Sequence, residues 1–202
     1  MSDACCSVPP PPRDNLSYRR VLWVALVANA VMFGVELAAS IFSGSSALAA
    51  DALDFLGDSA NYALSLGALA AGGAWISRVA LLKGTAMSLY GIAVLAYAAW
   101  RAWLGVPPEP ITMGVVGLLA LGVNFGVAML LFPFREGDAN MRSVWLCTRN
   151  DVIANILVLV AAAGVFGTGT VWPDVGVAAF LAVLGLTSGR SVIRQARAEL
   201  SA

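Results

Sequence analysis

The sequence predicts an all-α membrane protein, with six transmembrane helices in a bundle and both termini in the cytoplasm. Three observations lead to this fold class. Hydrophobic residues make up 59% of the 202 residues and charged residues only 12%, about half the charged share of a soluble domain. The apolar residues fall into six runs, each close to the roughly 20 residues that a spanning helix needs. Finally, Lys and Arg gather in the connections on one side of these runs.

The six apolar runs are separated by short segments rich in Gly and Pro, which are typical of connections between helices. The predicted helices are Tyr18–Phe42, Ala47–Gly73, Val79–Trp103, Ile111–Phe132, Ser143–Phe166 and Trp172–Val192. Residues 1–17 are expected to form a disordered tail, because they are polar, rich in proline and too poor in apolar residues for a signal peptide. Residues 18–192 form the transmembrane domain, and residues 193–202 are expected to be a short basic tail with no regulatory domain after it.

Basic residues give the orientation. The connections expected on one side hold a single basic residue, Arg101, whereas the connections and tails on the side of the two termini hold ten. These are Arg13, Arg19, Arg20, Arg78, Lys83, Arg135, Arg142, Arg190, Arg194 and Arg197, with Arg78 and Lys83 placed between the second and third helices. Cytoplasmic connections are enriched in Lys and Arg. The pattern therefore predicts a multi-pass protein of the plasma (inner) membrane with both termini inside.

The composition gives no indication of a nucleic-acid partner or of histidine chemistry. The formal net charge is zero, so nothing in the charge balance indicates a nucleic-acid partner. There are three cysteines and no histidine, which removes the commonest metal ligand and proton carrier. Cys5 and Cys6 are expected to be thiols of the tail rather than a metal or lipid site.

Three aspartates lie in the first half of the second helix. A charged side chain at the centre of a lipid-facing helix costs about 2.5–3.5 kcal/mol on insertion scales. Asp51, Asp54 and Asp58 are spaced three and four apart, so they share one stripe of the helix. Asp54 and Asp58 are one turn apart, and their oxygens could close on one cation.

The fifth helix carries a matching stripe, in which Cys147, Asp151 and Asn155 recur every four residues. Arg149 points away and can extend towards the cytoplasmic surface. Asp54, Asp58, Cys147 and Asp151 could therefore supply one four-ligand site. Three oxygens and one sulfur at tetrahedral spacing suit zinc, whereas six oxygens would have indicated magnesium or calcium.

Structural roles compete with these assignments. Asp51 could cap its helix or bond to a neighbour, and Asp54 and Asp58 could share a proton. Cys147 could be a small buried hydrophobe, and Glu36 a proton site or a partner for a polar group. The asparagines are expected to join helices by hydrogen bonds rather than bind metal; they are Asn29, Asn61, Asn124 and Asn155.

The segments "FSGSSALAADALDFLGDSANYALSL", "CTRNDVIANILVLVAAAG" and "WPDVGVAAFLAVLGLTSGRSVIRQA" resemble the cation diffusion facilitator family of divalent metal transporters. The resemblance implies six membrane helices, with a pair of ligands on each of helices two and five. The matching pairs here are Asp54 with Asp58, and Cys147 with Asp151. It further implies a zinc-like divalent cation at the midplane, exchange for protons by alternating access, and a homodimer.

Three features depart from that family's pattern. Cys147 stands where the family usually has His or Asp, and Asp54 stands where a histidine is common, so the metal preference can differ. The cytoplasmic ferredoxin-like domain that usually follows helix six is not expected in this chain.

The sequence therefore predicts a transporter, not an enzyme, that exports a divalent metal from the cytoplasm in exchange for protons, with no permanently bound cofactor. Zinc is the expected cargo, with cadmium, cobalt, iron or manganese as alternatives, and membrane lipid is the surrounding partner. The competing hypotheses are a non-transporting six-helix subunit or scaffold, an intramembrane enzyme that uses paired aspartates as aspartic proteases do, and a channel.

Overall fold

The computed structural model describes residues 16–68, 73–136 and 139–201. Within them the chain forms six α-helices and one short 3₁₀ turn, and no strand. The elements are α1 (Leu16–Ser43), α2 (Ser46–Ala68), α3 (Gly73–Leu104), α4 (Pro110–Leu131), η2 (Phe132–Phe134), α5 (Ala139–Thr168) and α6 (Trp172–Ser201). The six helices match the six predicted runs, so the predicted fold class is confirmed.

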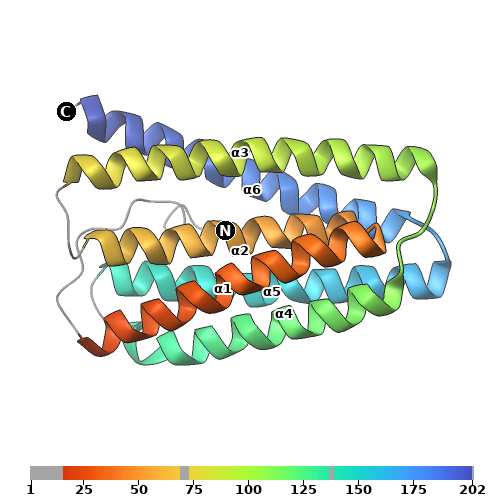
Figure 1. Cartoon of the computed structure of the whole chain (residues 1–202), viewed down its shortest axis with the longest axis horizontal. Coiled ribbons are helices and arrows are strands. Elements are labelled where there is room, and N and C mark those ends of the chain that lie inside the picture. Colours follow the sequence, from red (N-terminus) through yellow and green to blue (C-terminus); the bar gives the residue numbers. More distant parts are fainter. Residues whose placement is uncertain (1–15, 69–72, 137–138, 202) are drawn as a thin grey trace.

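The helices lie side by side, and α1 begins at the same end of the bundle at which α6 ends (Figure 1). We call this the basic end, because Arg19, Arg20, Arg135 and Arg194 belong to the turns nearest to it. The opposite end holds the connections α1–α2, α3–α4 and α5–α6. The even number of crossings thus returns the chain to its starting side, as the distribution of Lys and Arg predicted.

Helix α2 is the central element. It packs against α1, α3, α5 and α6, while α4 covers α1 and α5 from the other side. Every other helix exposes large apolar side chains, but among the described residues α2 exposes none. The aspartates of α2 therefore face protein rather than lipid.

The other five helices are long and apolar enough to cross a membrane. Helix α2 has 23 residues but carries three carboxylates, and its neighbours supply the apolar surface that would meet lipid. Intramembrane carboxylates are tolerated when they face the interior of a bundle. The chain is thus a multi-pass membrane protein.

A buried carboxylate joins the start of α2 to the start of α6. The oxygens of Asp174 accept hydrogen bonds from both hydroxyls of Ser45 and Ser46, at 2.6 Å each, and from the backbone N–H groups of Ser46 and Ala47, at 2.8 and 3.0 Å. The first N–H groups of a helix have no partner within the helix, and negative charge is favourable at this end. Asp174 therefore caps α2 while fixing its position against α6.

Helices α3 and α6 approach closely through glycine. A Cβ built on Gly189 would lie 2.6 Å from Ser88 Oγ and 3.0 Å from the carbonyl oxygen of Gly84. Small residues at such a contact let two membrane helices pack backbone against backbone. This contact fixes one wall of the pocket described below.

Two of the three connections at the opposite end are shaped by a glycine and by a helix cap. Gly44 turns the chain between α1 and α2 with a positive φ of 71°, a conformation that glycine adopts without strain. Glu109 caps α4 by accepting from the N–H groups of Ile111 and Thr112. These hydrogen bonds, from Thr112 first, lower the pKa of Glu109 below its usual value.

Arg78 and Lys83 were predicted to lie in the connection between the second and third helices. That was wrong, because both lie inside α3, and Lys83 is only 8% exposed. Helix α6 continues to Ser201 through the residues expected to form a basic tail. The expected disordered tail, with Cys5 and Cys6, lies outside the described residues except for its last two positions.

Candidate metal site

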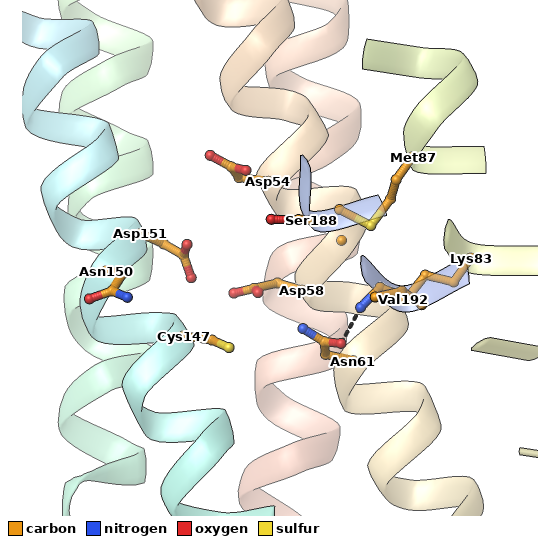
Figure 2. Close-up of a pocket in the computed structure, with 11 residues that line it drawn as sticks. Asp54, Asp58, Asn61, Lys83, Met87, Cys147, Asn150, Asp151, Ser188 and Val192 are labelled. Carbon is orange, nitrogen blue, oxygen red and sulfur yellow. Dashed lines mark hydrogen bonds between the residues drawn. The ribbon is translucent and has the colours of Figure 1, made fainter. Parts of the chain in front are cut away.

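Helices α2 and α5 bring the four predicted ligands to one pocket. Asp54 and Asp58 from α2, and Cys147 and Asp151 from α5, line a cavity of about 50 Å³. Figure 2 shows the side chains of the two helices pointing towards each other across this space. We call these four residues the pocket cluster. Their convergence follows from the spacing of four, which places each pair on one face of its helix.

Asp58 is the best-connected member of the pocket cluster. It accepts a hydrogen bond from the hydroxyl of Tyr62, with 3.2 Å between the oxygens. Tyr62 Oη lies 2.7 Å from Thr148 Oγ1 of α5. The carboxylates of Asp58 and Asp151 also interact directly. Tyr62 thus ties the α2 pair to α5 one turn nearer the basic end.

The four side chains surround the cavity without closing on one point. In the described part of the chain, no three Cys, Asp or Glu side chains lie close enough together to hold a metal ion as they stand. An ion bound by three or four of these groups has to draw them together by side-chain rotation or by a small movement of α5 against α2. The donor set itself, three carboxylates and one sulfur, suits a divalent cation.

A cation already lines the same pocket. Lys83 of α3 donates a hydrogen bond to Asn61 Oδ1, and its charge acts on Asp58. Figure 2 places both residues at the side of the pocket away from α5. Lys83 partly offsets the negative charge of the pocket cluster, because opposite charges attract strongly where water is excluded.

A larger apolar cavity adjoins the pocket cluster. Asp54 and Asp151 line a second space of about 270 Å³, whose remaining lining comes mostly from apolar side chains of α5 and α6. Its walls include Ile153 and Phe180, which are 57% and 53% exposed on the outer surface of the bundle. The two aspartates therefore lie between a polar pocket and an apolar one.

Asp51 does not line the pocket with Asp54 and Asp58. It is fully buried and accepts a hydrogen bond from Asn155 Nδ2 at 3.3 Å. Asp51 thus bonds to a neighbouring helix, which is one of the roles that the sequence left open for it, and Asn155 joins α5 to α2. Arg149 is exposed, as expected, and stacks 5.5 Å from the ring of Trp145.

Sequence reasoning missed three polar residues near the site. Tyr62 could have been found, because it follows Asp58 by four residues on the same face. Thr148 and Lys83 could not, because nothing in the sequence shows that a threonine beside Cys147, or a lysine ten residues into α3, points inward.

A comparison with protein families identifies the family of the chain. Residues 22–201 match the model of the cation efflux transmembrane domain. The chain belongs to the cation efflux family. This confirms the resemblance to the cation diffusion facilitators that the sequence of the second, fifth and sixth helices indicated.

Two curated cation efflux proteins are similar to the chain. They are the metal cation efflux system protein CzcD of Cupriavidus metallidurans and the cation efflux system protein CzcD of an Alcaligenes species, each 25% identical over 176 residues. The match covers 80% of this chain and 55% of each relative. The chain thus spans about half the length of the curated relatives that it matches.

Proposed function

We propose that this cation efflux domain transports a divalent metal cation out of the cytoplasm. The observation that carries the proposal is the pocket cluster, in which four groups of metal-ligating type from two helices line one pocket between the helices of the bundle. The names of the curated relatives, which are cation efflux proteins, support the same activity. The basic end is the cytoplasmic side in this proposal, and the plasma membrane is the location.

Zinc is the proposed cargo. Its preferred tetrahedral sites combine sulfur and oxygen ligands, and Cys147 is the one thiol of the pocket cluster. Cadmium, cobalt, iron and manganese share parts of this chemistry, and their order depends on whether the sulfur binds.

Protons are the proposed counter-ion. Three carboxylates around one cavity of about 50 Å³ carry more negative charge than Lys83 alone offsets. They cannot all remain charged without a further cation, because like charges this close repel. Metal and protons therefore compete for the same oxygens. If the metal-bound and proton-bound forms can each reorient between the two sides, a proton gradient drives metal outward.

The proposal is tested with Asp58→Asn and Asp151→Asn in vesicles that contain a zinc-responsive dye. Each variant keeps the shape of the side chain but loses a charged ligand, so proton-driven zinc uptake should fall to background. Glu136→Gln makes a similar change at an exposed carboxylate of the basic end and should transport like the original chain. Full uptake by both aspartate variants would remove the pocket cluster as the site.

Cys147 is tested separately, because its sulfur would make the site prefer softer metal ions such as zinc and cadmium. Cys147→Asp replaces the sulfur by oxygen and should shift the preference from zinc or cadmium towards manganese or iron. Uptake of each metal by the same vesicles measures this order. An unaltered order would show that the sulfur is not a ligand.

A non-transporting subunit of the same fold is the second candidate. The observation that favours it is that, among the described side chains, no three Cys, Asp or Glu residues converge as a metal site. Such a subunit would bind no metal when purified alone. Metal analysis of the purified chain, with and without Asp58→Asn, separates the two candidates.

A further inference from the structure

We propose that Glu36, Asp51 and Asn155 form a second, all-oxygen binding site for the transported divalent cation, one turn of α2 farther from the basic end than Asp54. We call these three residues the deep cluster. The inference rests on the proposed transport function, because it gives the cation a second position on its way through the bundle.

The deep cluster joins three helices at a fully buried point. Glu36 comes from α1, Asp51 from α2 and Asn155 from α5, and each side chain is 0% exposed. Asn155 donates to Asp51 Oδ1 at 3.3 Å, and the carboxylate of Glu36 lies beside that of Asp51 and interacts with it. Two carboxylates side by side in a membrane interior need a positive partner.

Four buried oxygens of the deep cluster have no hydrogen-bond partner. They are Glu36 Oε1, Glu36 Oε2, Asp51 Oδ2 and Asn155 Oδ1. Buried polar atoms without a partner are uncommon in folded proteins, and each needs an explanation. Here all four are acceptors, so the missing partner is positively charged or a donor.

One cation accounts for these oxygens better than one proton. A proton shared between Glu36 and Asp51 satisfies one oxygen of each and leaves Asn155 Oδ1 and the other Glu36 oxygen unpaired. A divalent ion bound between the three side chains would give these oxygens a partner, and its charge equals that of two carboxylates. Carboxylate and amide oxygens without sulfur are the ligands that hard cations such as Mn²⁺ and Mg²⁺ prefer.

The position of the deep cluster suits a path through the bundle. Asp51 precedes Asp54 by three residues, which is about 4.5 Å along a helix axis. Asn155 follows Asp151 by four residues and donates to its carbonyl oxygen at 2.9 Å. A cation that leaves the pocket cluster towards the opposite end therefore meets the deep cluster next, on the same two helices.

The first experiment measures binding without transport. In the purified chain that carries Asp58→Asn and Asp151→Asn, the pocket cluster is disabled, and Mn²⁺ added alone should still bind with an electron paramagnetic resonance spectrum of oxygen ligation. Adding Glu36→Gln should weaken this binding by roughly tenfold or more. Adding Glu136→Gln instead should leave it unchanged. The absence of Mn²⁺ binding before Glu36 is replaced would overturn the proposal.

The second experiment changes only Glu36 in the original chain. Its result therefore does not depend on whether the double variant folds. Glu36→Gln should keep cadmium bound at the pocket cluster, seen as sulfur-to-metal absorption from Cys147, while proton-driven uptake falls by about tenfold or more. Glu36→Asp should restore part of the uptake. Uptake by Glu36→Gln equal to that of the original chain would refute the deep cluster. A Glu36→Gln variant that still binds Mn²⁺ and changes only the pH dependence of uptake would refute it as well. The proposal that the pocket cluster is the transport site fails on a different result, which is full uptake by Asp58→Asn and by Asp151→Asn.

Discussion

At the scale of single residues, two of the three intramembrane aspartates of α2 lie against a particular partner. Asp58 accepts from Tyr62 and faces Asp151, whereas Asp51 accepts from Asn155. Asp54 lies between them and borders both cavities. The stripe read from the sequence is thus divided in two by the helices that pack against it.

Tyr62→Phe tests the support of Asp58. The hydroxyl holds one carboxylate oxygen in place, and loss of such a support commonly lowers metal affinity by about tenfold or more. Zinc affinity of the purified protein, measured by competition with a zinc dye, should fall by that factor. Tyr97→Phe is the matched control, because the Tyr97 hydroxyl bonds weakly to the carbonyl oxygen of Ser40, away from the pocket. Equal affinities of both variants would show that Tyr62 does not act through Asp58.

At the scale of elements, the position of α2 depends on contacts at its start and in its middle. Its start is fixed to α6 by Asp174, and its middle is tied to α5 through Tyr62 and Asn155. Gly185 of α6 allows a close approach, since an added Cβ would lie 2.5 Å from Leu53 Cδ2. Helix α2 is therefore held against α6 at its start, and polar groups join its middle to α5.

Asp174→Asn tests the junction between α2 and α6. The carboxylate accepts four hydrogen bonds at a helix start, and an amide would point its NH₂ group at some of these donors. The free energy of unfolding should fall by about 2 kcal/mol or more, seen as a lower midpoint of thermal unfolding in detergent. Glu109→Gln alters an exposed cap and should lower the midpoint less. A midpoint unchanged by Asp174→Asn would show that the junction contributes little.

At the scale of the whole molecule, charge and apolar surface set the arrangement in the membrane. Large apolar side chains cover α1, α3, α4, α5 and α6, while α2 is enclosed. Among the described residues near the opposite end, Arg101 is the one basic side chain, and it donates to the carbonyl oxygen of Val106. An asymmetry of this kind orients a bundle with its basic end in the cytoplasm.

Thiol labelling of intact cells tests this orientation. In a chain that carries Cys5→Ser and Cys6→Ser, Thr170→Cys at the opposite end should react with a membrane-impermeant maleimide added outside. Glu136→Cys at the basic end should react only after the membrane is opened. Both replaced residues are exposed, and the remaining Cys147 is buried. The reverse pattern of labelling would invert the direction of transport that we propose.

The sequence by itself determined the number of helices, their approximate ends and the pairing of Asp54 with Asp58 and of Cys147 with Asp151. These follow from local rules, because the apolar length needed to cross a membrane and the spacing of four are properties of single helices. The tertiary structure alone decided that Lys83 and Tyr62 reach the pocket cluster, and that Asp51 turns instead to Glu36 and Asn155. Such partners lie on different helices, and which faces meet depends on how all six helices pack, which no single segment encodes.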